Sequence, residues 1–277
     1  MTTICGIDFT SAPSRRKRIA IAGGRRRGDD FALDGIDACA DWHAFEAWLA
    51  RPGPWVGGFD FPFGLPRPLV ESLGWPAEWR ALIARYAALS RAEIRALFRA
   101  YCDARPAGAK FAHRACDIPA GASPSMKWVN PPVAWMLHAG APRLIAAGVH
   151  IPGLADGDRA RVALEAYPGY TARLIVGRAS YKSDDPARQT PARRDARRRI
   201  VAALEAGAAA GLPRLRASPR LMRACIDDAS GDSLDAVICA LQAAWGLERG
   251  DAGFGLPPDL DPLEGWIVGV PAPARLR

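Results

Sequence analysis

The sequence predicts an α/β domain with a mixed five-stranded sheet, flanking helices and a helical insertion. Over roughly the first sixty residues, short apolar runs alternate with turns, which is typical of an antiparallel meander. A helical segment then leads to a fourth strand, so a crossover follows the meander. Between about residues 68 and 159, long helical stretches replace the strands. A chain of 277 residues can bury such a core, and we expect residues 1–277 to form a single domain.

The predicted strands are short apolar runs bounded by turn-forming residues. They cover residues 4–9, 18–22, 31–36, 55–61 and 161–167, with 266–270 as a candidate late strand. The short links between the first three favour antiparallel neighbours. Pro62 and Pro66 stop the fourth run, because proline has no N–H to donate to a sheet ladder.

The predicted helices show apolar residues at spacings of three and four. They cover residues 42–49, 76–101, 132–147, 191–210 and 232–245. In the last of them, Asp232 and Asp235 share a face with small residues such as Ala236 and Cys239, whereas the large apolar residues form a separate stripe. Small residues on that face permit another element to approach closely.

The composition predicts an ordered protein with a basic surface. Hydrophobic residues make up 49% of the chain and charged residues 24%, which is ordinary for a globular protein. Lys and Arg number 37 against 29 Asp and Glu, for a formal net charge of +8. Most of these cations are Arg, which matches phosphate geometry and favours a polyanionic partner. GC-rich coding would produce the same excess of Arg, and this alternative stays open.

The cysteines and the N-terminal residues predict a cytoplasmic protein with no membrane partner. None of the six cysteines is spaced as C-x-x-C, so buried thiols in a reducing compartment fit better than a zinc ribbon or a disulfide framework. The N-terminal residues enter a strand without a charged-then-apolar leader, and no apolar run is long enough to span a bilayer.

Short acidic motifs, widely separated in the chain, point to one site. Asp8 and Asp60 end apolar strands, Glu165 lies in the fifth strand, and Asp232 and Asp235 open the last helix. If the first and fourth strands are neighbours, their terminal carboxylates meet at one edge of the sheet. Gathered carboxylates raise one another's pKa values by repulsion, so such a cluster is typical of a divalent cation site.

Each acid also has a local structural explanation. Asp8 and Asp60 can start turns by bonding to the downstream backbone, and Glu165 can pair with an arginine. Asp232 can cap the last helix, and Asp235 can stabilise its first turn. Capping and turn formation explain Asp8 and Asp235 least well, so we expect these two at the centre of the site.

The order of the motifs resembles a known family. The motifs are Gly6-Ile7-Asp8, Asp60-Phe61-Pro62-Phe63-Gly64, His113-Arg114-Ala115-Cys116-Asp117, Glu165-Ala166-Tyr167-Pro168, Tyr181-Lys182 and the run from Asp232 to Ala240. Together they are similar to predicted nucleases with the ribonuclease H (RNase H) fold, catalogued as domain-of-unknown-function family 429. The resemblance extends from Gly6 to about Val270. It implies an RNase H-like sheet and nuclease activity, and conveys no substrate.

The resemblance also implies a metal centre. Asp8, Asp60, Asp232 and Asp235 would hold Mg²⁺ or Mn²⁺, because hard cations prefer oxygen ligands. Two ions about 4 Å apart would activate the attacking water and stabilise the leaving oxygen of a phosphodiester. Glu165 would join Asp8, Asp60 and Asp235 in the catalytic set, as an accessory ligand or base. The choice between Asp60 and Glu165 as the main ligand of the middle strands stays open.

Basic residues supply candidates for binding nucleic acid. Lys182 and Arg114 are isolated cations within the motifs of the family. Two Arg-rich runs add further candidates, which in the second run are Arg193, Arg194 and Arg197. A run of charges is also the usual mark of a solvated helix face, and both interpretations stay open.

Two other classes of function are compatible with the sequence. Actin-like phosphotransferases share the core strand order, and Asp8-Phe9-Thr10-Ser11 resembles their first phosphate loop. Gly231-Asp232-Ser233 is a poor second phosphate loop, however, and the chain has no G-x-x-x-x-G-K sequence. A nucleic-acid-binding protein that does not cut would have no need of every acid. A metal-dependent nuclease is therefore our leading hypothesis, with DNA and RNA undistinguished.

Overall fold

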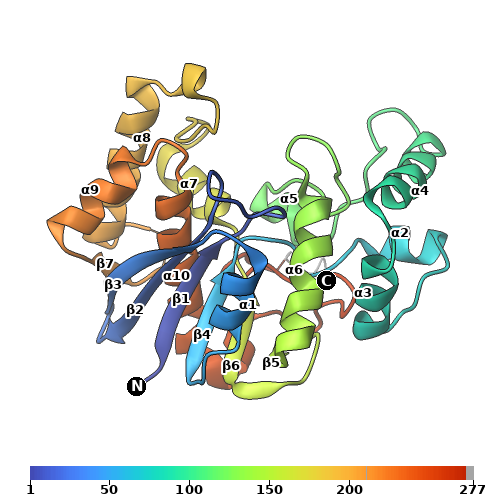
Figure 1. The fold of residues 1–277 in the computed structure, drawn as a ribbon, viewed down its shortest axis with the longest axis horizontal. Helices are drawn as coiled ribbons and strands as arrows, with labels where there is room; N and C mark the ends of the chain where they lie inside the picture. The colour runs from blue at the N-terminus through green and yellow to red at the C-terminus, as the bar shows by residue number, and fades with distance from the viewer. Residues whose placement is uncertain (210, 273–277) are drawn as a thin grey trace, which may run out of the picture.

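A mixed seven-stranded sheet forms the centre of the computed structural model, which describes residues 1–209 and 211–272 (Figure 1). The strand order is β5-β6-β4-β1-β2-β3-β7. In chain order, the strands are β1 Thr3–Asp8, β2 Ile19–Arg27, β3 Asp30–Cys39, β4 Trp55–Phe59, β5 Val149–His150, β6 Asp158–Glu165 and β7 Arg214–Arg216.

Helices flank the sheet. They are α1 Trp42–Leu49, α2 Arg67–Ser72, α3 Trp79–Ala87, α4 Arg91–Asp103, α5 Asp117–Ala120, α6 Val133–Ala147, α7 Pro168–Val176, α8 Pro191–Ala206, α9 Pro219–Asp227 and α10 Asp232–Glu248, with 3₁₀ turns η1 Pro186–Arg188 and η2 Gly250–Gly255. No helix among residues 1–209 and 211–272 is both long enough and apolar enough to cross a membrane.

The predicted neighbourhood of the first and fourth strands is confirmed. β1 is antiparallel to β2, and β2 to β3, so residues 3–39 form the expected meander. α1 then carries the chain across to β4, which lies beside β1 in parallel. The amide of Asp60 donates to the carbonyl oxygen of Ile7 at 2.9 Å. The ends of β1 and β4 that carry Asp8 and Asp60 therefore lie side by side.

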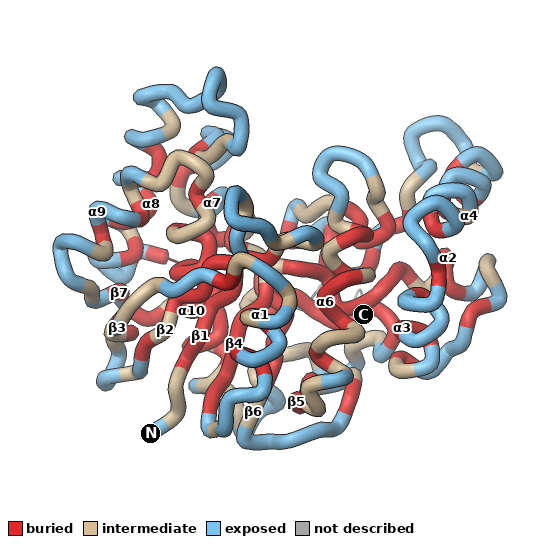
Figure 2. The backbone as a smooth tube through the Cα atoms, in the orientation of Figure 1, coloured by how far each residue is buried: buried red, intermediate tan, exposed pale blue. Residues whose placement is uncertain are grey.

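Two apolar layers cover the two faces of the sheet. α1 and α6 lie in front of the sheet in Figure 1, and α10 lies behind it. The first layer joins Ile7 and Phe59 of the sheet to Phe45 of α1. The second joins Ile4 of the sheet to Ile238 of α10. Figure 2 shows the resulting buried band along the central strands and α10. This arrangement brings the start of α10 to the carboxyl end of β1.

The helical segment at about 68–159 contains α2 to α6 and the short strand β5. Its buried side chains, among them Trp79, Tyr86 and Leu144, belong to the same apolar layer as α1 and the front of the sheet. The segment therefore shares the core of the sheet.

Several boundaries differ from the sequence predictions. The sheet has seven strands instead of five, because β5 and β7 are two and three residues long and show no periodicity. Residues 266–270 contribute only an isolated bridge between Ile267 and Glu165. The helix predicted at 76–101 is broken before Ser90, which caps α4 in a capping box with Glu93. The helix predicted at 191–210 ends at Gly207, whose φ of 71° ends α8, and residue 210 lies outside the described residues.

Two glycines allow α10 to lie very close to the sheet. A Cβ atom on Gly6 of β1 would lie 2.0 Å from the carbonyl oxygen of Ala236, and one on Gly58 of β4 would lie 2.4 Å from that of Cys239. The close approach expected from the small residues of this helix is thus observed. It brings the first turn of α10 to the ends of β1 and β4.

We expect Gly6→Ala to destabilise the protein by about 3 kcal/mol, because the added methyl group meets backbone atoms that cannot move independently. Gly23→Ala is the matched control, since a Cβ atom there meets nothing within 4 Å. Urea denaturation of both variants measures the difference. Equal stabilities would contradict the close packing of α10 against β1.

Candidate metal centre

Three of the predicted acids meet at the carboxyl ends of the central strands β1 and β4. Carboxylate oxygens of Asp8, Asp60 and Asp235 all lie within 4.8 Å of one another. Asp8 ends β1, Asp60 follows β4, and Asp235 lies in the first turn of α10. Asp8 and Asp235 are buried, and Asp60 is half-buried. We call these three residues the acid triad.

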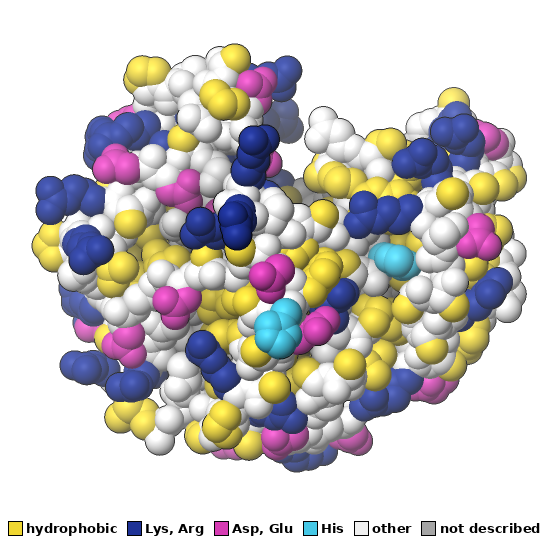
Figure 3. Space-filling model, in the orientation of Figure 1, with side chains coloured by type: hydrophobic (Ala, Val, Ile, Leu, Met, Phe, Trp, Pro, Cys, Tyr) yellow, Lys and Arg dark blue, Asp and Glu magenta, His cyan; other side chains and the backbone are white. Residues whose placement is uncertain are grey.

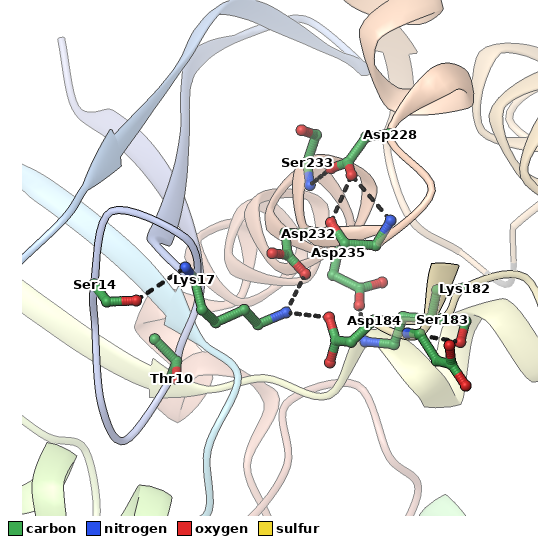
Figure 4. Close-up of polar contacts among 12 residues, drawn as sticks. Thr10, Ser14, Lys17, Lys182, Ser183, Asp184, Asp228, Asp232, Ser233 and Asp235 are labelled. Atoms are coloured by element: carbon green, nitrogen blue, oxygen red, sulfur yellow. Dashed lines mark hydrogen bonds and ion pairs between the residues drawn. The ribbon is translucent and has the colours of Figure 1, made fainter. Parts of the chain in front are cut away.

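The start of α10 directs Asp232 and Asp235 toward the ends of β1 and β4. Gly231 adopts φ 81°, a left-handed conformation that glycine takes without strain. Asp228 accepts a hydrogen bond from the amide of Ser233 at 2.8 Å and another from the hydroxyl of Ser230 at 2.5 Å (Figure 4). Asp228 therefore does the capping that was considered for Asp232, and the carboxylate of Asp232 is left to face the site.

Asp8 lacks a partner within residues 1–209 and 211–272. Its side chain is 6% exposed, yet its carboxylate takes part in no hydrogen bond or ion pair there. Burial raises the pKa of Asp8 well above its usual range, and Lys182 opposes this shift only in part. A buried carboxylate without a partner is costly. Together with Asp60 and Asp235, Asp8 provides three carboxylates, and oxygen ligands of this kind fit a hard divalent cation such as Mg²⁺ or Mn²⁺.

Asp235 has partners from the segment that precedes α8. The hydroxyl of Tyr181 donates to Oδ1 of Asp235 at 2.6 Å, and the ammonium of Lys182 forms an ion pair with Oδ2. Lys182 thus contacts the acid triad at Asp235 and lines the same cavity as Asp8 and Asp60. The structure places it where a phosphate bound at the triad would be within its reach.

Asp232 lies beside the acid triad and has a cation of its own. Nζ of Lys17, from the loop between β1 and β2, lies 2.7 Å from Asp232 and 2.8 Å from Asp184 (Figure 4). Asp232 was expected to be a metal ligand, but Lys17 already neutralises it. Lys17 lies in the first Arg-rich run, between Arg16 and Arg18, and nothing in that local pattern indicates its distant partner.

Glu165 pairs with an arginine, which is one of the two alternatives left open by the sequence. Its two carboxylate oxygens accept hydrogen bonds from Arg114 at 2.7 and 2.8 Å, and Oε2 also accepts one from the amide of Phe63 at 2.9 Å. Arg114 is 3% exposed and also pairs with Asp117 at 2.9 Å. Both groups are therefore engaged within the protein, which makes Asp60 the better candidate for the ligand from the middle strands.

Sequence reasoning missed Glu264, which joins the same buried network. Its carboxylate accepts hydrogen bonds from the amides of Ala115 and Arg67, at 2.7 and 2.8 Å. Its carbonyl oxygen accepts one from Arg114 at 2.9 Å. No local motif marks Glu264. Only its burial in the folded protein reveals it.

The second Arg-rich run is mostly engaged within the protein. Arg197 is 3% exposed and donates to the carbonyl oxygens of Tyr181 and Ile226, at 2.6 and 2.7 Å. This differs from the expectation of a phosphate contact, because the guanidinium of Arg197 points into the protein. Arg194 is exposed and forms an ion pair with Asp227, whereas Arg193 is half-buried at the start of α8 and donates to the carbonyl oxygen of Arg188.

Asp8 and Asp60 of the acid triad line a cavity of about 690 Å³. Asp232, Lys17 and Lys182 also line this cavity. Figure 3 shows the surface hollowed between the part formed by α7 to α9 and the part containing α5 and α6, with Lys and Arg side chains gathered beside the hollow. A solvent-accessible site of this kind admits an anionic ligand to the acids.

The acid triad predicts how stability depends on pH without metal. Burial, opposed by Lys182 and reinforced by Asp235, raises the pKa of Asp60 from 3.8 to about 7. The folded protein then holds this proton more tightly than the unfolded chain. The contribution of Asp60 to the free energy of unfolding therefore falls as the pH rises from about 4 to about 7. In a chelating buffer, the melting temperature of the wild type should fall more between about pH 5 and pH 8 than that of Asp60→Asn. Parallel curves would contradict the shift.

No protein-family model, curated protein or solved structure matches this chain. A functional interpretation therefore depends on the geometry of the acid triad and its surroundings.

Proposed function

We propose that this protein is a metal-dependent nuclease with an RNase H-like fold, which hydrolyses phosphodiester bonds in nucleic acid. The observation that carries the proposal is the acid triad, in which the buried carboxylate of Asp8 has no partner among the described residues. Such a group is costly unless a cation compensates it. The lysines beside the triad favour an anionic substrate.

The topology supports the fold on which the proposal depends. The five strands β3, β2, β1, β4 and β6 lie in that order, with an antiparallel meander followed by a parallel crossover through α1. A meander followed by a helical crossover is the arrangement that the sequence predicted and that resembles the RNase H fold. The additional strands β5 and β7 lie at the two edges of the sheet, away from the site.

The chain supplies each group that the reaction needs. The triad would hold Mg²⁺ or Mn²⁺, which when bound polarises phosphate oxygens and increases the acidity of water. Lys182 and Lys17 compensate the charge of a phosphodiester in the cavity. Attack of water forms one new P–O bond and breaks the P–O bond to the leaving sugar, whose oxygen takes up a proton. The net products are a phosphomonoester and an alcohol.

Cleavage of end-labelled oligonucleotides tests the proposal. We expect Mn²⁺- or Mg²⁺-dependent products from DNA or RNA, and none in a chelating buffer. Single-stranded and duplex forms of each should be compared, because the substrate class is open. Binding without cleavage would favour a non-catalytic nucleic-acid-binding protein. Metal-dependent transfer of phosphate from ATP without cleavage would favour an actin-like phosphotransferase.

A further inference from the structure

The carboxylates around the cavity differ in what compensates them. Glu165 is held by Arg114 at 2.7 Å, and Asp232 is held by Lys17 at 2.7 Å. Among the residues that the structure describes, the acid triad is the only group of three or more His, Cys, Asp or Glu side chains whose ligand atoms all lie within 4.8 Å of one another. A second ion would need further oxygen ligands. Asp232 and Glu165 also line the cavity, but neither belongs to the acid triad and each is ion-paired, whereas Asp235 of the triad is paired with Lys182 and Asp8 and Asp60 form no ion pair among the described residues.

We propose that the centre binds a single divalent cation and that Lys182 provides the second positive centre of the reaction, in place of a second ion. This inference rests on the proposed function for the role of Lys182, whereas the number of ions is a separate property. The sequence analysis expected two ions bound by four free aspartates. The structure instead shows one group of three close carboxylates, with the ammonium of Lys182 paired to Asp235 and that of Lys17 paired to Asp232.

The formal charges support a centre with one divalent cation and Lys182 as the second positive centre. Asp8, Asp60, Asp232 and Asp235 carry four negative charges, and Lys17 and Lys182 return two positive ones. One divalent cation then brings the group to neutrality, which four free carboxylates would reach only with two ions. Asp184, the second partner of Lys17, lies at the exposed rim, where water screens it.

Lys182 is held in position by its neighbours. The amide of Ser183 donates to the carbonyl oxygen of Ala229 at 3.1 Å, and Arg197 donates to that of Tyr181 at 2.6 Å. A Cβ atom on Gly231 would lie 2.7 Å from Cβ of Lys182, so the segment packs directly on the start of α10. Arg197 is therefore a positioning residue for Lys182. A cation that is fixed in advance costs little reorganisation during reaction.

The type of cation also fits. The chain has only four lysines, and two of them lie at this site. An ammonium is a compact point charge, whereas a guanidinium is planar and wider. The compact group suits a position between the carboxylate of Asp235 and a phosphate.

Calorimetric titration with Mn²⁺ tests the number of ions. We expect one Mn²⁺ per chain for the wild type and for Lys110→Met, which is a control that removes an exposed lysine elsewhere. The double variant Lys17→Met with Lys182→Met frees Asp232 and should bind a second Mn²⁺. Electron paramagnetic resonance should show an isolated ion in the wild type and a spin-coupled pair in the double variant. Two coupled ions in the wild type, or no binding, would overturn the inference.

Lys182→Met separates a reactive role from a structural one. Removing the ammonium beside Asp235 should tighten Mn²⁺ binding, because like charges no longer repel, and should slow cleavage about 100-fold. Loss of both Mn²⁺ binding and cleavage in Lys182→Met would indicate a structural role and overturn the inference. Cleavage by a wild type with two bound ions would leave the proposed function intact. Binding of a single Mn²⁺ without cleavage of any nucleic acid would refute the proposed nuclease activity and would still agree with a centre that holds one ion.

Discussion

Asp8→Asn and Asp235→Asn should each lower phosphodiester cleavage by about a thousandfold or more, equivalent to about 4 kcal/mol of transition-state stabilisation. Each substitution keeps the shape of the side chain and removes a charged oxygen ligand from the acid triad. Three such ligands gather within 4.8 Å, so losing one should also weaken Mn²⁺ binding strongly. Calorimetric titration and cleavage assays on DNA and RNA measure the two effects.

The metal-free variants should differ in stability. Asp8 forms no hydrogen bond or ion pair among the described residues, so Asp8→Asn removes a buried carboxylate that burial and its neighbouring acids destabilise more than Lys182 stabilises it, and should raise the melting temperature by about 2 °C or more. Asp235→Asn leaves the ammonium of Lys182 without its carboxylate and should gain less. Asp184→Asn is a control, because its side chain is 73% exposed at the rim. Undiminished Mn²⁺ binding in both triad variants would refute the centre.

Arg114→Met should destabilise the protein by about 3–5 kcal/mol, because it removes one partner of a buried charge network. Asp117 and Glu165 are 0% and 4% exposed and would lose their common counter-charge. Because methionine fills a similar volume, the decrease in the free energy of unfolding measures the removed charge more than lost packing. Urea denaturation at neutral pH gives the free energy of unfolding.

The control for this prediction is Arg198→Met. Arg198 pairs with Asp195, and both side chains are 54% exposed. Water screens such a pair, so its removal should change stability by about 1 kcal/mol or less. If Arg114→Met were as mild as Arg198→Met, the network around Glu165 would contribute little to the fold. Glu165 would then again be a candidate for the metal ligand from the middle strands.

Local patterns in the chain were sufficient to predict the frame of the site. Apolar runs ended by Asp8 and Asp60 predicted two strands, and both acids lie at their carboxyl ends. Helical spacing predicted α1 at Trp42–Leu49 and the start of α10 at Asp232. Small residues beside Asp235 predicted the close approach of that helix to the sheet. Each of these inferences depends on neighbours within a few positions, because periodicity and proline act locally.

Partners of the charged side chains were decided only by the tertiary structure. Lys17 and Asp232 are 215 positions apart, and Arg114 and Glu165 are 51 apart. Ion pairs form wherever folding brings opposite charges within a few ångströms, and no local pattern encodes that proximity. For the same reason, Arg197 within an Arg-rich run was expected at the surface and is buried beneath Tyr181. The sequence by itself determined which acids end the strands and open the helix, whereas the packing of α10, the loop of Lys17 and the segment of Lys182 decided which acids meet and which of them are paired with a lysine.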